Sequence, residues 1–282
     1  MSLLEHTKPK VSVGSGLGLV VCGVGGRMGS VVVRLIHQTP GVKLLGAIGR
    51  PGSPRIGGDA GEVAGVGRLG VAVRDQIGSL LKENVAIIDF TRPAASLGYL
   101  RAAARRGVPI VIGTTGFTPR EWSEIKRLGR RTKVLLSPNM SVGVNLLISL
   151  LGKVARSLGD DYDVEIVEAH HRLKRDAPSG TALAMAREVA KALKRDLGTV
   201  GVYGRKGIVG ERKKKEIGIM SVRAGDIVGE HTVIFGGIGE RIEFIHRAHS
   251  RETFARGAIR AVQWLVKQKK GLYSMQDVLR LG

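Results

Sequence analysis

The stretch LGLVVCGVGGRMGSVVVRLI, residues 17–36, joins an apolar run, a glycine-rich turn and a second apolar segment with helical spacing. It predicts a buried strand over residues 17–22, a tight turn over 23–29 and a helix continuing through 30–36. This order suits a dinucleotide pyrophosphate, because glycines let the backbone approach it and the helix N-terminus faces its phosphates. The match to G-x-G-x-x-G is imperfect, since Met28 holds the third position, and a plain tight turn is the alternative. Because a strand is predicted before the turn and a helix after it, as a nucleotide site requires, the stretch favours a nucleotide site.

The first half of the chain alternates between strands and helices. Further strands are predicted at residues 42–48, 85–90, 108–112 and 133–136, and helices at 94–106 and 121–131. This alternation predicts an α/β fold with a Rossmann-like, doubly wound parallel sheet. Ligands of such sheets lie outside the carboxyl ends of the strands. Small or polar residues follow three strands, so we expect one crevice lined by segments 23–29, 113–116 and 137–140.

The pattern changes near residue 140, after which strands follow one another with short turns. Helices are predicted at 146–158, 182–193 and 251–267, the last capped by Ser250, and strands at 163–167, 217–223, 230–235 and 241–246, the last two joined by a hairpin at 236–239. Residues 198–215 are glycine-rich and basic, which predicts a long mobile loop. We therefore expect a second, smaller α+β domain with a mixed, largely antiparallel sheet.

The stretch EAHHRLKRDAPSGT, residues 168–181, gathers two histidines, a lysine and a Ser-Gly-Thr turn. We expect it to form a loop between the strand at 163–167 and the helix at 182–193. Ser179 is placed to cap that helix, whose free N–H groups favour a bound anion. Because histidine titrates near neutral pH, the stretch predicts a site that holds a carboxylate and transfers a proton. Ordinary histidines beside a simple helix cap are the alternative.

The charge of the chain is strongly positive. Its 282 residues contain 45 Lys and Arg against 24 Asp and Glu, which gives a net charge of +21. Such a balance attracts nucleic acid and anionic surfaces. The charge is nevertheless scattered, the densest run is RKKK at 212–215, and aromatic residues make up only 4% of the chain. Because base-stacking side chains are scarce, we interpret most of the charge as a solvated surface and expect no nucleic-acid partner.

The remaining composition excludes several classes of protein. The single Cys22 excludes an intramolecular disulfide framework and a cysteine metal cluster, and we expect no metal site. No run appears long and apolar enough to span a bilayer, so no membrane partner is expected. Residues 1–12 lack the apolar core of a signal peptide and predict a disordered lead-in. A cytoplasmic protein is the expectation.

The end of the second strand bears on the choice of nucleotide. An acidic residue there commonly binds the adenosine ribose of NAD, but Gly49 and Arg50 occupy the position. An acid would repel a 2′-phosphate, whereas an arginine binds one, which favours NADP(H) over NAD(H). Arg27, Arg50 and Arg55 are the candidate phosphate partners, with exposed solubilising arginines as the alternative.

Taken together, these segments resemble the dihydrodipicolinate reductase family of bacterial lysine and diaminopimelate synthesis. The resemblance covers nearly the whole chain after the lead-in. The string at 168–181 is highly specific to the family. The other segments that carry the resemblance are GVGGRMG (23–29), DFTRP (89–93), GTTGF (113–117), NMSVGVN (139–145) and RAGDIVGEH (223–231).

The resemblance implies a role for each matching position. His170 corresponds to the proton donor and acceptor, and Lys174 to a second proton donor. The positions that bind the substrate carboxylates are His171, Gly180 and Thr181. The positions that contact the nicotinamide cofactor, NADPH in preference and otherwise NADH, are Gly23, Val24, Gly25, Gly26, Arg27, Met28, Gly113, Thr114, Thr115, Ser137, Pro138, Asn139 and Met140.

The resemblance also implies a reaction and an architecture. The reaction is the reduction of 4-hydroxy-tetrahydrodipicolinate, via dihydrodipicolinate, to tetrahydrodipicolinate. The architecture is a dinucleotide-binding domain of residues 1–140 completed by 248–282, a substrate-binding and oligomerisation domain of residues 141–247, and a homotetramer. One position departs from the family: members that use NADH well often carry an acid where Gly49 stands, so efficient use of NADH is not expected.

Three other functions compete with this interpretation. A semialdehyde dehydrogenase needs a thiol nucleophile, for which Cys22 is the candidate, although a packing role suits its position better. A basic nucleic-acid-binding protein would form salt-sensitive complexes without binding nicotinamide. A catalytically inactive NADP-binding regulator would show no turnover, and the pair of His170 and Lys174 argues against it.

Overall fold

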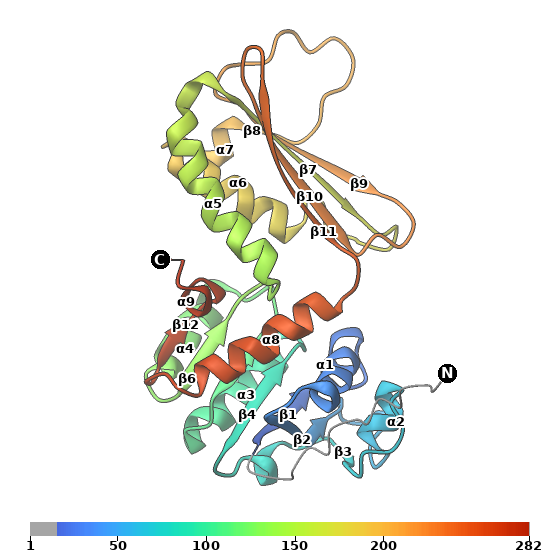
Figure 1. Cartoon of the computed structure of the whole chain (residues 1–282). Helices are drawn as coiled ribbons and strands as arrows, with labels where there is room; N and C mark the ends of the chain where they lie inside the picture. Colours follow the sequence, from blue (N-terminus) through green and yellow to red (C-terminus); the bar gives the residue numbers. More distant parts are fainter. Residues whose placement is uncertain (1–15, 282) are drawn as a thin grey trace, which may run out of the picture.

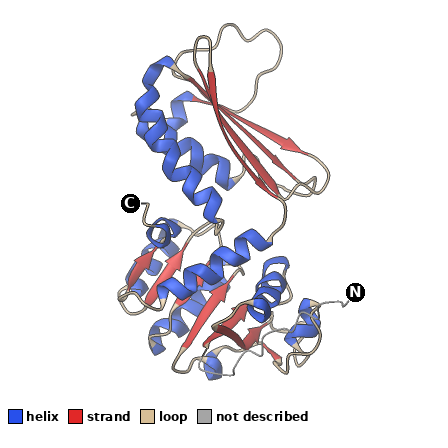
Figure 2. Ribbon diagram, viewed as in Figure 1, coloured by secondary structure: helices blue, strands red, loops and turns tan. Residues whose placement is uncertain are grey.

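The computed structural model describes residues 16–281, and the lead-in expected at residues 1–12 lies outside them. Two sheets organise the chain. The first is built from the N-terminal half and the C-terminal end, and the second from the segment between them (Figure 1). Helices lie on both faces of the first sheet and on one face of the second (Figure 2).

The first sheet has seven strands in the order β12-β6-β5-β4-β1-β2-β3, and every pairing is parallel. The strands are β1 (Leu17–Cys22), β2 (Val42–Ile48), β3 (Val73–Arg74), β4 (Val85–Asp89), β5 (Ile110–Ile112), β6 (Lys133–Leu136) and β12 (Gly271–Tyr273). The chain passes from β1 to β2 on one side and returns to β4 on the other side of β1. At such a switch point the carboxyl ends of the strands leave a crevice.

Both faces of this sheet are covered, which explains why β1 and β4 are apolar along nearly their whole length. One face packs against α1 (Arg27–Gln38), α2 (Ala60–Ala64), α8 (Glu252–Leu265) and α9 (Met275–Leu279). The other face packs against α3 (Pro93–Arg106), α4 (Pro119–Gly129) and the short η1 (Gly78–Leu80). The expectation of a Rossmann-like, doubly wound parallel sheet is confirmed.

The second sheet has five strands in the order β11-β10-β7-β9-β8. They are β7 (Asp163–His170), β8 (Gly201–Val202), β9 (Ile217–Arg223), β10 (Gly229–Gly236) and β11 (Arg241–Ala248). The sheet is mixed, as expected: β10 pairs antiparallel with β7 and β11, whereas β9 pairs parallel with β7 and β8. One face packs against α5 (Val142–Leu158), α6 (Gly180–Ala192) and α7 (Leu197–Val200), and the turn η2 (Gly159–Asp161) follows α5. Burial alternates along β10, because only one of its faces is covered.

The basic segment after α6 is more ordered than the sequence predicts. The expectation of a loop is wrong for residues 198–202, which belong to α7 and β8, and residues 203–216 lack helix and strand. Arg205 donates two hydrogen bonds to Glu165, at 2.8 and 3.0 Å, and Arg212 donates one to the same carboxylate at 3.0 Å. Two cations of this segment are therefore bound to β7.

Several predicted boundaries are wrong for identifiable reasons. Helix α1 begins at Arg27 and includes Gly29, because the chain turns fully within residues 23–26. Strand β7 extends to His170, because its whole length pairs with neighbouring strands, so this histidine lies on a strand and not on a loop. The prediction missed β12 and α9, because both are short. The three residues of β12 are held by pairing with β6 and by the packing of Leu272 and Tyr273 against the cores.

The start of α8 agrees in part with the prediction. Ser250 Oγ accepts a hydrogen bond of 3.2 Å from the Glu252 amide, but the residue at the N-cap is Arg251. The predicted cap of α6 is confirmed, since Ser179 is its N-cap. Helix α5 begins one turn earlier than predicted, at Val142, because Ser141 caps it there.

Helix α5 belongs to the one segment of the described residues, Val142–Asp161, that is long and apolar enough to cross a membrane by length and composition, with a mean hydropathy of 1.3. The expectation that the sequence has no such run is corrected on this point. The helix buries Val144, Leu147 and Leu151 against α6 and the second sheet. Only 28% of the apolar window in this segment is buried, and Leu146 and Leu150 are exposed, so this packing accounts for one face of the helix.

Candidate active site

The glycine turn after β1 leaves an open helix N-terminus at the crevice. The N-cap of α1 is Gly26, no side chain bonds to the cap, and the first turn of the helix has no acidic residue. Gly23 has a φ of 83°, in the left-handed region that favours glycine. A Cβ at Gly29 would lie 2.1 Å from the Gly23 carbonyl oxygen, so the helix packs closer to the turn than any side chain allows. The turn therefore presents backbone N–H groups to an anion.

A cavity of about 520 Å³ lies between this turn and the loops after β2 and β4. The turn residues Gly23, Val24, Gly25 and Gly26 form one wall. The charged side chains in its lining are all arginines, Arg50, Arg55 and Arg92. Small residues that allow a close approach, together with cations, suit a phosphate-bearing ligand such as a dinucleotide.

A second cavity, of about 280 Å³, meets the first at Phe90, which lines both. Gly113 makes room for this ring, because a Cβ at Gly113 would lie 2.1 Å from the Phe90 Cε1 atom. The cavity brings together many of the residues singled out in the sequence: Arg27, Met28, Gly113, Pro138, Asn139, Met140, His170, His171 and Thr181. Thus the three strand-end segments and the histidine pair reach two neighbouring cavities that share Phe90 in their linings.

Five of the predicted site residues do not line either cavity: Thr114, Thr115, Ser137, Lys174 and Gly180. Thr114 is buried beneath the crevice, where its Oγ1 accepts a hydrogen bond of 2.8 Å from Ser96. Ser137 donates to the Asn139 carbonyl at 2.7 Å and so shapes the loop after β6. Lys174 is engaged in an ion pair of 2.9 Å with Asp176.

The buried carboxylate of Glu168 bonds to His170. No role was predicted for Glu168 from the sequence. Glu168 is fully buried, and its Oε2 lies 2.5 Å from His170 Nδ1. Arg223 donates to both oxygens of Glu168, at 2.7 and 2.9 Å. Burial acts to raise the pKa of Glu168, but hydrogen bonds from Arg223 and His170 outweigh it and lower the pKa to about 2. Burial lowers the pKa of His170, and the hydrogen bond and charge of Glu168 oppose that effect.

A second histidine, also without a predicted role, lies behind the first. The His231 ring packs edge-on against His170 with 5.3 Å between ring centroids. Its Nε2 lies 3.2 Å from Ser179 Oγ, and burial lowers the pKa of His231 to about 3. A neutral His231 therefore packs beside the site without adding a charge. Its position follows from the strand register, which sets His231 opposite Glu168.

The N-terminus of α6 faces the second cavity. Ser179 caps the helix through a hydrogen bond of 3.1 Å from the Ala182 amide. Among the described residues, the backbone N–H groups of Gly180 and Thr181 have no protein acceptor. Asn139 Nδ2 donates to Thr181 Oγ1 at 3.0 Å, which ties the loop after β6 to this helix. The buried Nδ1 of His171 is also without a protein partner among these residues. The arrangement offers several donors to an anionic ligand.

The buried carboxyl group of Asp89 directly precedes Phe90, the residue that lines both cavities. Asp89, the last residue of β4, accepts hydrogen bonds from the Thr91 amide at 3.0 Å and from Thr91 Oγ1 at 2.6 Å. Its other oxygen, Oδ2, has no partner among the described residues. Burial raises the pKa of Asp89 from 3.8 to about 6, although the hydrogen bonds from Thr91 partly offset the effect.

We expect Asp89 to make stability depend on pH. Because its folded-state pKa of about 6 lies above the ordinary 3.8, its protonated form contributes stability that is fully present below pH 3.8. That contribution, roughly 3 kcal/mol for two pKa units, is lost as the pH rises through 6. Urea unfolding of the parent chain and of Asp89→Asn between pH 4 and 7.5 measures it. The stability difference between the two proteins should change across this range, and a constant difference would contradict the assignment.

Thiol and metal chemistry have little support in the geometry. Cys22 is fully buried, and burial raises the pKa of its thiol well above the ordinary range. A buried, protonated thiol is a poor nucleophile, which disfavours the semialdehyde dehydrogenase alternative. Within residues 16–281, no group of three or more His, Cys, Asp or Glu side chains is arranged to hold a metal ion.

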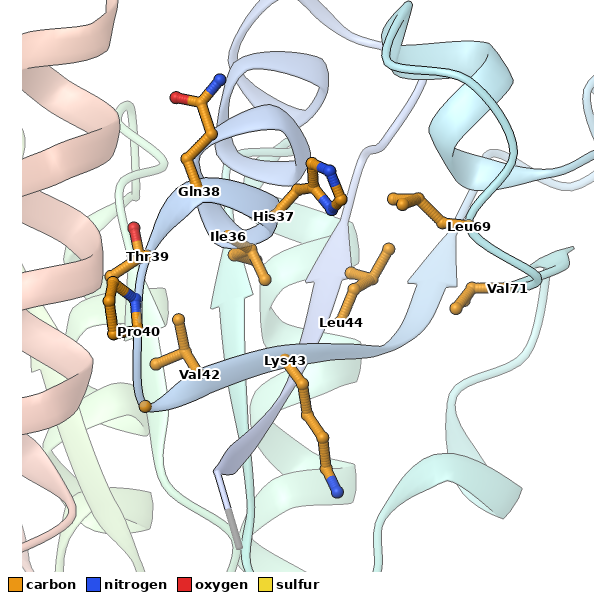
Figure 3. A pocket seen from close by; sticks show the side chains of 11 residues that line it. Ile36, His37, Gln38, Thr39, Pro40, Val42, Lys43, Leu44, Leu69 and Val71 are labelled. Carbon is orange, nitrogen blue, oxygen red and sulfur yellow. The ribbon is translucent and has the colours of Figure 1, made fainter. Parts of the chain in front are cut away.

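A further pocket of about 320 Å³ lies at the opposite end of β2 (Figure 3). The end of α1, the start of β2 and the segment around Leu69 and Val71 form it, and its side chains are mainly apolar. None of the predicted site residues lines it. The crevice at the carboxyl ends of the strands is therefore the candidate active site.

The fold and the two neighbouring cavities define a protein with a Rossmann-type dinucleotide-binding domain. The model of the family "Dihydrodipicolinate reductase, N-terminus" matches residues 17–140, and that of "Dihydrodipicolinate reductase, C-terminus" matches residues 143–279. The chain is 54% identical to 4-hydroxy-tetrahydrodipicolinate reductase of Syntrophus aciditrophicus over 263 residues, which are 93% of this chain and 98% of that protein. It is 52% identical to the enzyme of the same name from Geobacter sulfurreducens, with the same coverage. The chain belongs to the dihydrodipicolinate reductase family.

Solved structures agree with this fold. Dipicolinate-bound dihydrodipicolinate reductase from Paenisporosarcina sp. TG-14 superposes with a TM-score of 0.72 at 22% identity, covering 93% of this chain and 98% of that chain. GenD2 from gentamicin A biosynthesis, in complex with NAD, superposes with a TM-score of 0.58 at 14% identity, covering 98% and 94%. At 22% and 14% identity, these superpositions show a shared fold and nothing more.

Proposed function

We propose that this protein reduces 4-hydroxy-tetrahydrodipicolinate, via dihydrodipicolinate, to tetrahydrodipicolinate with NAD(P)H, in the cytoplasmic synthesis of diaminopimelate and lysine. The names of relatives more than 50% identical over nearly the whole chain support the reaction. One structural observation carries the proposal. The cavity at the glycine turn and the cavity at His170 meet at Phe90, so a cofactor and a small substrate can lie in contact.

The dinucleotide is held at the first cavity in this proposal. The glycine turn and the open N-terminus of α1 bind its pyrophosphate, and Arg50 and Arg55 lie where they can bind further phosphate. Segments 113–116 and 137–140 flank the nicotinamide ring. Thr114 and Ser137 act from beneath this wall, because their hydroxyls hold the loops that carry Gly113 and Asn139. Thr115 is exposed at the same loop and contacts the cofactor in this proposal. When bound, the reduced nicotinamide supplies the hydride that is added to ring C4 of the substrate.

The substrate carboxylates are bound by donors around the second cavity. The free amides of Gly180 and Thr181 and the positive end of α6 take one carboxylate, and His171 contributes its ring. The dipicolinate bound to dihydrodipicolinate reductase from Paenisporosarcina sp. TG-14 supports a ring dicarboxylate as the ligand class. The ammonium group of Lys174 forms an ion pair with Asp176. Lys174 must therefore leave Asp176 before it can bind a substrate carboxylate.

His170 supplies the proton that the reduced ring requires. Hydride addition at C4 leaves an enamine, whose carbon takes a proton to complete the product. Since Glu168 occupies Nδ1, the other ring nitrogen, Nε2, is the atom that delivers the proton. Lys174 assists as a second donor once it has left Asp176. General acid catalysis of this kind contributes about 10²–10⁴ in rate.

The division into domains and the assembly are part of the proposal. Residues 1–140 with 248–282 form the dinucleotide-binding domain, and residues 141–247 form the substrate-binding and oligomerisation domain of a homotetramer. Two observations support this division. Strand β12 extends the first sheet beside β6, and α8 packs on the face that also carries α1.

The proposal includes a preference for NADPH, because Arg50 lines the first cavity and no carboxylate stands beside it. A Cβ at Gly49 would lie 3.0 Å from both Ile56 and Val73, so an acid at this position would need its neighbours to move. We expect Arg50→Ala to raise the KM for NADPH about 10- to 100-fold, since a charge-assisted hydrogen bond contributes about 1.5–3 kcal/mol. The KM for NADH should change little. Steady-state kinetics with both cofactors measures this, with Arg74→Ala as the control.

An equal rise in both KM values for Arg50→Ala would exclude a specific contact with the 2′-phosphate. The control is suitable because Arg74 is also an exposed arginine near the end of its strand, and it bonds Ser79 at 3.3 Å outside the cavity.

The reaction itself is tested by oxidation of NADPH and NADH with freshly prepared 4-hydroxy-tetrahydrodipicolinate. We expect oxidation that depends on the substrate and is inhibited by dipicolinate. Absence of substrate-dependent oxidation with either cofactor would contradict the proposed function. A preference for NADH would contradict only the argument from Gly49 and Arg50.

A further inference from the structure

The side chain of Glu168 joins two parts of the candidate site. Its Oε2 contacts His170 Nδ1 at 2.5 Å, and its Oε1 accepts a hydrogen bond of 3.1 Å from the backbone amide of Ser179. His170 ends β7, whereas Ser179 caps the helix α6. A single carboxylate, with no exposed surface, is therefore bonded both to the proposed acid and to the turn that carries the proposed carboxylate-binding amides.

The partners of Glu168 keep this carboxylate ionised and immobile. Arg223 donates to both oxygens, at 2.7 and 2.9 Å, and it also donates to the Asp176 carbonyl at 2.7 Å. The parallel register of β7 and β9 sets Arg223 opposite His170, so the arginine reaches the carboxylate from the neighbouring strand. An ionised carboxylate with a forked arginine partner has few orientations available.

This geometry determines which nitrogen of His170 carries a proton. An ionised carboxylate only accepts hydrogen bonds, so His170 Nδ1 must be the donor in the contact of 2.5 Å. Among the described residues, no protein hydrogen bond involves His170 Nε2, and Gly229 leaves it space, since a Cβ there would lie 3.0 Å away. The proton that His170 gains and loses is therefore the one on Nε2.

We propose that Glu168 is the positioning residue of the reaction. It fixes His170 in the Nδ1–H tautomer, supports the protonated ring, and holds this acid at a set distance from the N-terminus of α6. The inference rests on the proposed function for its catalytic meaning, but the tautomer and the titration of His170 are properties of the chain alone.

Glu168 acts on the pKa of His170 in the opposite direction to the other charged neighbours. Glu168 is the carboxylate that faces the ring, and its hydrogen bond and charge raise the pKa of His170, whereas burial and nearby cations lower it. The groups that face the ring or line its cavity from other elements are Lys174, Arg223, His231, His171, Arg27 and Arg251. Lys174, Arg223, Arg27 and Arg251 carry positive charge, whereas His231 is neutral because burial lowers its pKa to about 3. Removing the charge of Glu168 therefore leaves His170 among cations, and its pKa must fall.

The test compares the parent chain with Glu168→Gln and Glu168→Asp, using ¹⁵N NMR of the histidine rings in the protein without ligands. His170→Gln identifies the signal among the 7 histidines. In the parent, we expect Nδ1 to remain protonated while Nε2 titrates. In Glu168→Gln, we expect a pKa for His170 lower by about one unit or more and a mixture of tautomers. Glu168→Asp keeps the charge and should restore much of the parent titration.

The kinetic arm measures the pH profile of kcat. Since the proton-donating form is the protonated ring, the alkaline limb should move to lower pH in Glu168→Gln, with kcat at pH 8 about tenfold lower or more. Glu165→Gln is the matched control, because Glu165 also lies on β7 and also accepts hydrogen bonds from arginine, but it lines neither cavity. Its pH profile should match that of the parent.

Each outcome bears on the proposal. A parent His170 with an unprotonated Nδ1 overturns it, even if the variants do not fold. An unchanged titration in Glu168→Gln overturns it, and so does a shifted titration with an unchanged pH profile. The expected NMR result in a chain without reductase activity would refute the proposed function while leaving the positioning of His170 established.

Discussion

His170→Gln should lower kcat by about 10²–10⁴, the contribution typical of a general acid. Glutamine approximates the size of the ring but does not titrate, so it cannot deliver the proton at the position of Nε2. Affinity for NADPH should change little, because His170 lines the second cavity and not the one at the glycine turn. Stopped-flow turnover and fluorescence titration with NADPH measure the two quantities separately.

A matched control for this variant is His37→Gln. His37 lies at the end of α1 and lines the remote pocket of Figure 3, at the opposite end of the sheet from the crevice. Its substitution should leave kcat within about twofold of the parent, because no step of the reaction lies near it. Turnover close to that of the parent in His170→Gln would remove this histidine from the mechanism.

Gly29→Ala should destabilise the chain and abolish dinucleotide binding. An alanine within a helix normally stabilises by about 1 kcal/mol relative to glycine. Here the added Cβ would lie 2.1 Å from the Gly23 carbonyl oxygen and 2.6 Å from its carbon, and both are backbone atoms that cannot rotate away. The turn must open or the helix must move, which should cost about 3 kcal/mol or more. Urea unfolding and NADPH titration measure the two effects.

The same substitution at Gly98 is the control. Gly98 also lies within a helix, α3, and a Cβ there would have no neighbour within 4 Å. Gly98→Ala should therefore stabilise the chain by about 0.5–1 kcal/mol and leave cofactor affinity unchanged. If the Gly29→Ala and Gly98→Ala proteins were equally stable, the close contact between α1 and the glycine turn would not be the reason for a glycine at position 29.

The sequence predicted the parts of the fold whose signals are local. The apolar strand, the glycine turn and the helix that follows are adjacent in the chain, so their composition alone indicated a dinucleotide crevice. The position of the third glycine also has a local explanation in retrospect. Gly29, and not residue 28, is the position in the first turn of α1 where a Cβ would meet the Gly23 carbonyl oxygen, at 2.1 Å.

The features that the sequence did not predict depend on pairing between distant segments. Glu168 was part of a recognised string, but its role depends on Arg223, and only the register of β7 with β9 brings the two together. His231 reaches the site in the same way, through the antiparallel pairing of β10 with β7. No periodicity or spacing within either segment reports such a register.

Lys174 shows a different limit of prediction from sequence. The family resemblance implied that Lys174 is a second proton donor, yet its ammonium group is paired with Asp176 and lies outside both cavities. A role in the reaction therefore requires the loop after β7 to rearrange when the substrate binds. The family resemblance assigned this residue a role, whereas its position in the absence of ligands depends on a local ion pair.

Transfer of deuterium from cofactor to product tests the central claim most directly. The protein is incubated with freshly prepared 4-hydroxy-tetrahydrodipicolinate and NADPH carrying two deuterium atoms at C4 of its nicotinamide, and the product is analysed by mass spectrometry and NMR. The account predicts tetrahydrodipicolinate with one deuterium at ring C4 for each NADPH oxidised. Oxidation of NADPH without deuterium in the product, or no oxidation that depends on the substrate, would contradict it.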